Sequence, residues 1–251
     1  MAEYVEVNGV DTWYDEQGDG DPLVLLHGGL TDSRDFAPNL GTLADRFRVL
    51  TPDRRGHGRT ADVPGPITME LMAADTIAFL EKVIGTPSRL VGYSAGAAVA
   101  LAVGRQRPDL VERLVLISGA FRKDGMIMTP QAGMEPPPHL IDAYAEVSPD
   151  GRDHFPVVVD KVATAFEAGD DLTEEDLGAV PCRTLVMSGD DDLVTLEHTI
   201  ALYRGLPNAQ LSIVPETSHL LLFEKPKTCT RIVSDFLTSD PSPTYMPIRR
   251  S

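Results

Sequence analysis

The pentapeptide Gly92-Tyr93-Ser94-Ala95-Gly96 constrains the fold of this chain more than any other stretch of it. Residues 89–91 before it are typical of a buried strand, and the alanine-rich residues 97–103 after it favour a helix. Because the pattern G-x-S-x-G surrounds the serine with small residues, the backbone can turn sharply and leave the hydroxyl exposed. The first N–H groups of the following helix point to the same place. The motif therefore indicates a nucleophilic serine, while a plain glycine-rich turn would have the same sequence.

Short apolar runs alternate with segments of helical periodicity along most of the chain. A hairpin comes first, because Asn8-Gly9 is a strong turn signal between two segments of alternating polarity. Strands are predicted at 4–7, 10–14, 22–26, 47–50, 89–91, 113–117, 184–187 and 210–214, and helices at 69–84, 95–106, 196–204 and 227–237. This order predicts an α/β fold with a mainly parallel sheet that is covered by helices on both faces.

Residues 121–180 interrupt this rhythm, because they contain no buried-strand signal. Helical patches are predicted near 140–147 and 157–166. An insertion of this length between two strands is typical of a cap over a functional site, and a packed helical excursion without a role is the alternative. Its methionines and aromatic residues could line an adaptable apolar pocket or form the core of the cap. They are Phe121, Met126, Met128, Met134, Tyr144, Phe155 and Phe166.

Residues 1–238 are predicted to form one domain, with this insertion at about 121–180 as its cap. After Thr238 the sequence becomes rich in proline and serine, so we expect residues 239–251 to be a flexible tail. Asp and Glu number 38 against 22 Lys and Arg, which gives a formal net charge of −16. This excess repels nucleic acid and anionic membrane surfaces, so neither is expected as a partner.

Cysteine usage and the N-terminal residues predict a cytoplasmic protein. Cys182 and Cys229 have no metal-ligand spacing, and nothing in the sequence demands a disulfide between them, which favours a reducing compartment. Residues 1–7 alternate polar and apolar side chains and do not resemble a secretory signal. The apolar runs are too short to cross a bilayer. The expected partner is a small-molecule substrate, and the chain is expected to be a monomer or a homodimer.

A serine becomes a good nucleophile only when a histidine accepts its proton and a carboxylate orients that histidine. In an open parallel sheet these groups should follow the carboxyl ends of strands. Of the six histidines, His27 and His219 meet this condition best. The other four are His57, His139, His154 and His198. The acidic run Asp190-Asp191-Asp192 follows the strand at 184–187 and offers three candidates for the carboxylate.

Several motifs in this order resemble the α/β-hydrolase superfamily, over roughly residues 4–120 and 181–238. They are His27-Gly28-Gly29, the D-x-R-G-x-G-x-T segment Asp53–Thr60, the G-x-S-x-G segment, the G-x-x-D segment Gly189–Asp192, and His219 followed by Glu224-Lys225-Pro226. The resemblance implies an α/β-hydrolase fold with a mostly parallel eight-stranded sheet and a helical cap.

The resemblance also implies a role for each residue. The catalytic groups would be Ser94, Asp192 and His219, with Asp190 and Asp191 as alternatives for the acid. The oxyanion hole would consist of the N–H groups of Ala95 and of Gly29, or of Leu30 in place of Gly29. His27 would brace the oxyanion loop, and His57 would be structural.

A serine at this position favours acyl transfer to water over the reactions of relatives that have an aspartate there. The resemblance therefore implies hydrolysis of a carboxylic ester or lactone, with no metal or organic cofactor. Enol-lactone or carbon–carbon bond hydrolysis and cofactor-free perhydrolysis use the same groups. An acyltransferase, a cyclase-like enzyme and a small-molecule receptor are the alternatives of another class.

Overall fold

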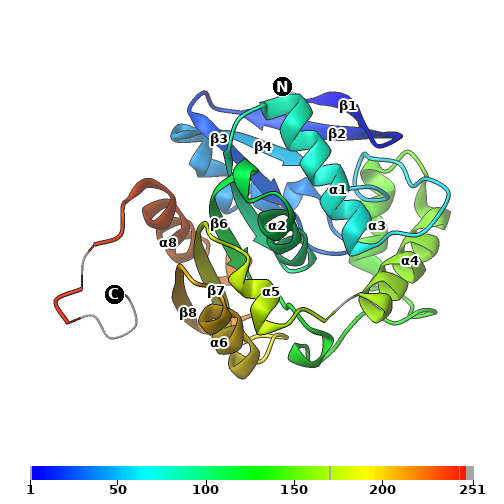
Figure 1. Cartoon of the computed structure of the whole chain (residues 1–251). Coiled ribbons are helices and arrows are strands. Elements are labelled where there is room, and N and C mark those ends of the chain that lie inside the picture. The colour runs from blue at the N-terminus through cyan, green and yellow to red at the C-terminus, as the bar shows by residue number, and fades with distance from the viewer. Residues whose placement is uncertain (1, 170, 243, 247–251) are drawn as a thin grey trace.

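The computed structural model describes residues 2–169, 171–242 and 244–246, and within them eight strands form one sheet (Figure 1). The strand order is β1-β2-β4-β3-β5-β6-β7-β8. The pairs β1/β2 and β2/β4 are antiparallel, and all other neighbouring strands are parallel. The strands are β1 (Glu3–Val7), β2 (Val10–Gln17), β3 (Asp21–Leu26), β4 (Phe47–Pro52), β5 (Ser88–Tyr93), β6 (Val111–Ile117), β7 (Arg183–Asp191) and β8 (Ala209–Ser218). The expected eight-stranded, mostly parallel α/β sheet is confirmed.

Helices cover this sheet and fill the connection between β6 and β7. They are α1 (Met69–Phe79), α2 (Ala95–Gln106), α3 (Pro138–Val147), α4 (Phe155–Ala168), α5 (Glu174–Gly178), α6 (Leu196–Gly205), α7 (Leu221–Glu224) and α8 (Pro226–Thr238). The single helix expected over 69–84 instead consists of α1 and a π-helical turn at Leu80–Ile84. That turn closes when the N–H of Gly85 donates to the carbonyl of Leu80 at 2.8 Å, and Gly85 has a φ of 70° that ends the helix.

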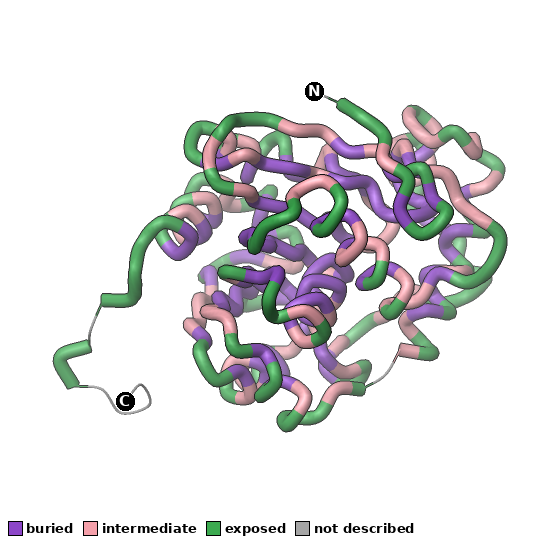
Figure 2. The backbone as a smooth tube through the Cα atoms, turned by 45° about the horizontal axis from the view of Figure 1, so that its top comes forward, coloured by how far each residue is buried: buried purple, intermediate pink, exposed green. Residues whose placement is uncertain are grey.

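Alternation along the strands produces two separate cores. In β3, Val24 and Leu26 pack in one cluster with residues of α1, α2 and α6, whereas Leu23 and Leu25 pack in the other cluster with residues of α8. Both faces of the central strands are therefore apolar, as in parallel sheets with helices on each side. Figure 2 shows the resulting buried centre beneath exposed outer segments.

The sheet places the residues of interest at one edge. Ser94 directly follows β5, and Asp192 and His219 directly follow the neighbouring strands β7 and β8. The strand predicted at 210–214 is longer in the structure, because β8 continues to Ser218, which pairs with Asp191 beyond a register shift in β7. Pro215 and Glu216 interrupt the alternation of apolar and polar residues by which a strand is recognised in the sequence. In the structure Glu216 has a left-handed φ of 55°, as at an irregularity within a strand.

The segment between β6 and β7 contains α3, α4 and α5 in its described part. Phe121, Tyr144 and Phe155 are buried in it, whereas Met128 and Met134 are exposed. Asp62 of the main body connects to this segment, since His154 and Lys161 of the insertion both contact its carboxylate. The expected flexible tail falls partly on residues 243 and 247–251, which lie outside the described residues.

Candidate active site

The turn at Ser94 requires an unusual backbone. Ser94 has a φ of 54° and a ψ of −120°, a conformation that residues with a side chain rarely adopt. Its N–H donates to the carbonyl of Ile117 at 2.8 Å, which ties the turn to β6. Two glycines make room for it: a Cβ on Gly92 would lie 2.2 Å from the carbonyl oxygen of Gly96, and a Cβ on Gly96 would lie 2.1 Å from that of Leu26. The small residues of the motif are therefore explained by close backbone approaches.

We expect Gly96→Ala to lower the free energy of unfolding by about 3 kcal/mol or more, because the new methyl group overlaps the backbone of β3. Gly104→Ala, in the same helix, is the matched control. A Cβ there would lie 3.4 Å from a methyl carbon of Leu114, and alanine favours the helix. Urea unfolding measures the free energy of unfolding of both variants. Equal stability of the two would contradict this explanation of the turn at Ser94.

Three side chains form a continuous hydrogen-bonded chain at the carboxyl edge of the sheet. Nδ1 of His219 lies 2.6 Å from Oδ1 of Asp192, and Nε2 lies 2.9 Å from Oγ of Ser94. Because an ionised carboxylate only accepts, Nδ1 carries the proton and Nε2 presents a lone pair to the serine hydroxyl. The hydroxyl of Tyr93 also donates to the carbonyl of His219 at 2.8 Å and fixes its backbone. The structure thus brings together the three residues expected from the sequence.

The carboxylate of Asp192 is fully buried and surrounded by donors. Its Oδ2 accepts from the hydroxyls of Ser118 at 2.5 Å and Ser188 at 3.0 Å, and its Oδ1 accepts from the N–H of Val194 at 3.2 Å. Burial alone would raise the pKa of Asp192, but the hydrogen bonds from His219 and Ser118 outweigh it and lower the pKa to about 2. Asp192 is therefore a carboxylate at neutral pH.

The other two acidic candidates lie elsewhere. Asp190 and Asp191 are exposed residues of β7. Oδ1 of Asp190 accepts from the N–H of Thr217 at 3.0 Å, and backbone hydrogen bonds from Glu216 and Thr217 lower the pKa of Asp190. Among the described residues, the carboxylate that contacts His219 belongs to Asp192.

The lowered pKa of Asp192 makes its contribution to stability depend on pH. Since the folded pKa of about 2 lies below the ordinary value of 3.8, the contribution is complete above pH 3.8 and is lost as pH falls toward 2. We expect the stability advantage of the wild type over Asp192→Asn to shrink by about 1 kcal/mol between pH 6 and pH 3. Urea unfolding at both pH values measures it, and a constant difference would be the contrary result.

The loop after β3 lies beside the serine. A Cβ on Gly28 would be 3.6 Å from Cβ of Ser94, and one on Gly29 would be 3.5 Å from Cβ of Ala95. Ala95 is the first residue of α2, so its N–H has no acceptor within the helix. Leu30, the alternative donor, follows in the same loop with a left-handed φ of 61°.

Arg54 and His27 orient this loop from its buried side. The guanidinium of Arg54 donates to the carbonyls of His27 at 2.6 Å and Gly28 at 2.7 Å, and Nδ1 of His27 donates to the carbonyl of Gly28 at 2.8 Å. In a trans peptide the N–H points away from the preceding carbonyl. The N–H of Gly29 is therefore turned away from Arg54. Burial lowers the pKa of Arg54 to about 9, so the guanidinium still carries its charge at neutral pH.

The remaining histidines have structural partners or lie apart from the serine. Nδ1 of His57 donates to the carbonyl of Arg55 at 2.8 Å, and His154 contacts Asp62. His198 is buried, stacks on Phe121 at 4.2 Å and accepts from its N–H, so it joins the insertion to α6. His139 lies at the start of α3. The contacts of His57 agree with the structural role that the resemblance implies for it.

Sequence reasoning missed the residues that support the main groups. Ser118 and Ser188 hold Asp192 in place, and Arg54 holds the glycine loop. The signal for the two serines is only that each directly follows a strand predicted from the sequence, at 113–117 and 184–187. Within the described part of the chain, no group of three or more His, Cys, Asp or Glu side chains could hold a metal ion. No helix in those residues is long and apolar enough to span a bilayer.

Comparisons with known proteins identify the family of this chain. A family model described as the alpha/beta hydrolase family matches residues 23–231. The chain is 29% identical to a putative carbamate hydrolase RutD of Caulobacter sp. (strain K31), over 86% of this chain and 91% of that protein. It is 28% identical to a 2-hydroxymuconate semialdehyde hydrolase of Pseudomonas putida, over 88% and 89% of the two chains.

A solved structure has the same architecture. The enol-lactonase from Burkholderia xenovorans LB400 is 27% identical, with a TM-score of 0.77 over 94% of this chain and all (100%) of that one. The residues matched by the family model include the glycine loop after β3, the turn at Ser94 and the strands that precede Asp192 and His219. The family model, the sequence relatives and the architecture all agree. This chain is therefore a hydrolase that belongs to the alpha/beta hydrolase family.

Proposed function

We propose that this hydrolase cleaves a carboxylic ester or lactone of a small, partly apolar molecule through an acyl-enzyme on Ser94. The observation that carries the proposal is the hydrogen-bonded chain from Asp192 through His219 to Ser94, with distances of 2.6 Å and 2.9 Å. This arrangement is the one that activates a serine for attack on a carbonyl carbon.

The reaction would begin when Oγ of Ser94 attacks the carbonyl carbon and its proton passes to Nε2 of His219. The negative charge on the former carbonyl oxygen would be held by the N–H groups of Ala95 and Gly29, or by Leu30 in place of Gly29. When the intermediate collapses, Nε2 donates its proton to the departing alkoxide. A water, deprotonated by the same nitrogen, then attacks the acyl-enzyme and releases the acid.

The carboxylate of Asp192 would hold His219 in the tautomer that this sequence of steps needs. It would also stabilise the imidazolium that forms in each half of the reaction. Besides His219, four donors surround Asp192, among them the backbone N–H of Gly189 at 3.3 Å, and they would keep the carboxylate ionised and immobile. The acid is therefore proposed as Asp192 and not as Asp190 or Asp191.

Two relatives support neighbouring reactions of the same groups. An enol-lactonase has a similar structure, and a 2-hydroxymuconate semialdehyde hydrolase has a similar sequence. Hydrolysis of an enol-lactone or of a carbon–carbon bond is therefore the second candidate. We place ester and simple lactone hydrolysis first because it needs only the groups named above.

A panel of p-nitrophenyl esters, simple lactones and one enol-lactone separates these possibilities. The proposal predicts turnover of a short ester or simple lactone by the wild type and none by Ser94→Ala. Exclusive turnover of the enol-lactone would favour the second candidate. If both proteins were inert on the whole panel while a small molecule raised the Tm, a receptor would be the better description.

A further inference from the structure

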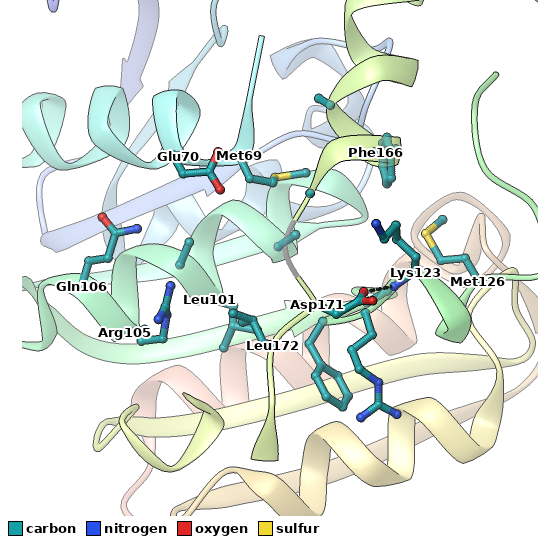
Figure 3. Close-up of a pocket in the computed structure, with 17 residues that line it drawn as sticks. Met69, Glu70, Leu101, Arg105, Gln106, Lys123, Met126, Phe166, Asp171 and Leu172 are labelled. Atoms are coloured by element: carbon teal, nitrogen blue, oxygen red, sulfur yellow. Dashed lines mark hydrogen bonds between the residues drawn. The ribbon is translucent and has the colours of Figure 1, made fainter. Parts of the chain in front are cut away.

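A pocket of about 160 Å³ lies beside α2, outside the hydrogen-bonded chain (Figure 3). One wall is a single face of α2, formed by Ala98, Leu101 and Ala102, which are spaced three to four residues apart. The opposite walls include Phe121 and Met126 from the segment after β6, Phe166 from α4 and Met69 from α1. The interior is apolar, whereas the exposed polar residues Glu70, Gln106, Lys123 and Asp171 lie around it.

This pocket lies close to the serine and shares lining residues with a smaller space beside the oxyanion loop. Ala98 is one helical turn from Ser94, because its N–H points to the Ser94 carbonyl at 3.4 Å. A smaller space of about 10 Å³ touches both Gly29 and Ala95, the two proposed oxyanion donors. Phe166 lines both spaces and would lie 3.9 Å from a Cβ on Gly29. Its ring therefore stands between the large pocket and the oxyanion loop.

A second pocket of about 290 Å³ lies between the loop after β3 and α3. It is lined by Thr31, Asp35 and Ala143, and by Phe223, which follows His219 in the chain. Thr31 lies 3.4 Å from a Cβ position on Gly28 that is itself 3.6 Å from Cβ of Ser94. Since His219 must give its proton to the leaving group, the departing alcohol would lie in this pocket, which Phe223 lines. The acyl part is then directed toward α2.

We propose that the pocket beside α2 is the acyl subsite and that it accepts an apolar group about the size of a phenyl ring. An apolar cavity of roughly 150 Å³ in a protein can hold one benzene molecule, which is close to the volume found here. Phe166 would set the selectivity for the acyl group, because that group must pass the Phe166 ring to enter the pocket. This inference rests on the proposed ester hydrolysis, since it assigns the two sides of that reaction.

Ala102→Phe tests the assignment by filling the pocket from the partly exposed surface of α2. Ala143→Phe is the matched control, because Ala143 is a half-buried helix residue that lines the other pocket. The measured quantity is the ratio of kcat/KM for p-nitrophenyl phenylacetate to that for p-nitrophenyl acetate. We expect Ala102→Phe to lower this ratio at least about tenfold. Ala143→Phe should leave it within about twofold, since the leaving group is the same in both substrates.

A ratio that falls in Ala143→Phe and not in Ala102→Phe would assign the acyl group to the other pocket. A ratio unchanged in both variants would equally overturn the inference. In either case Ser94-dependent turnover of p-nitrophenyl acetate would leave the proposed function standing.

Failure of the proposed function is recognised separately, as absence of that turnover in the wild type. The subsite is then judged by calorimetric binding of phenylacetate to Ser94→Ala. We expect binding that is lost in the Ser94→Ala/Ala102→Phe double variant. Absent binding, or binding equal in both, overturns the subsite.

Discussion

Replacing Ser94 by alanine is expected to lower kcat for p-nitrophenyl acetate by a factor on the order of 10⁴ or more. The variant loses the atom that forms the bond to the acyl group, while the lone pair of His219 remains without a proton to accept. Folding should change little, because Ala95, Gly96 and the hydrogen bond from residue 94 to Ile117 keep the turn in place. Steady-state kinetics and the Tm, measured on the same preparation, check both parts.

Ser88→Ala is the matched control for this result. Ser88 is a buried serine at the start of β5, the strand that leads to Ser94, and its hydroxyl has no hydrogen-bond partner among the described residues. Its removal should leave kcat within about twofold, since Ser88 lies at the opposite end of β5. Activity retained in Ser94→Ala, or lost equally in both variants, would show that Ser94 is not the nucleophile.

Asp192→Asn is expected to have the second largest effect, a loss of kcat on the order of 10⁴. An asparagine can turn its amide NH₂ toward Nδ1 of His219, which then accepts instead of donating. The proton moves to Nε2, and that nitrogen can no longer accept the hydroxyl proton of Ser94. The pH dependence of kcat measures the same change, because the variant should stay slow at every pH where it is folded.

Asp190→Asn and Asp191→Asn serve as controls with the same change of charge. Both side chains are exposed and lie away from His219, so each variant should keep kcat within about threefold of the wild type. A large loss in either control, together with an active Asp192→Asn, would move the acid to another position. The comparison therefore shows whether activity depends on the carboxylate that contacts His219 or on any acidic residue of this run.

Much of this site could be predicted from sequence because its residues follow strands. Ser94, Asp192 and His219 each come directly after a strand, and the carboxyl ends of parallel strands meet at one edge. The choice of Asp192 over Asp190 needed the family resemblance, since the side-chain directions depend on the register shift after Gly189. No sequence pattern near Gly189 predicts that register shift.

Other parts of the site depend on contacts between segments far apart in the chain. Ser118 reaches Asp192 across 74 positions, and Phe121 meets His198 across 77. Neither contact has a periodicity or a motif of its own. The pocket beside α2 is similarly assembled from α1, α2, α4 and the segment after β6, so its size could be found only from the fold.

The most direct test of the central claim is to locate the acyl group on the enzyme. We would mix the wild type with excess p-nitrophenyl acetate, quench it in acid within the first turnover, and map the modified peptide by mass spectrometry. The account predicts one acetyl group on Ser94, absent from Ser94→Ala and accumulating with a burst of p-nitrophenol in the wild type. Steady turnover with no acetyl group on Ser94, or with the group on another residue, would contradict it.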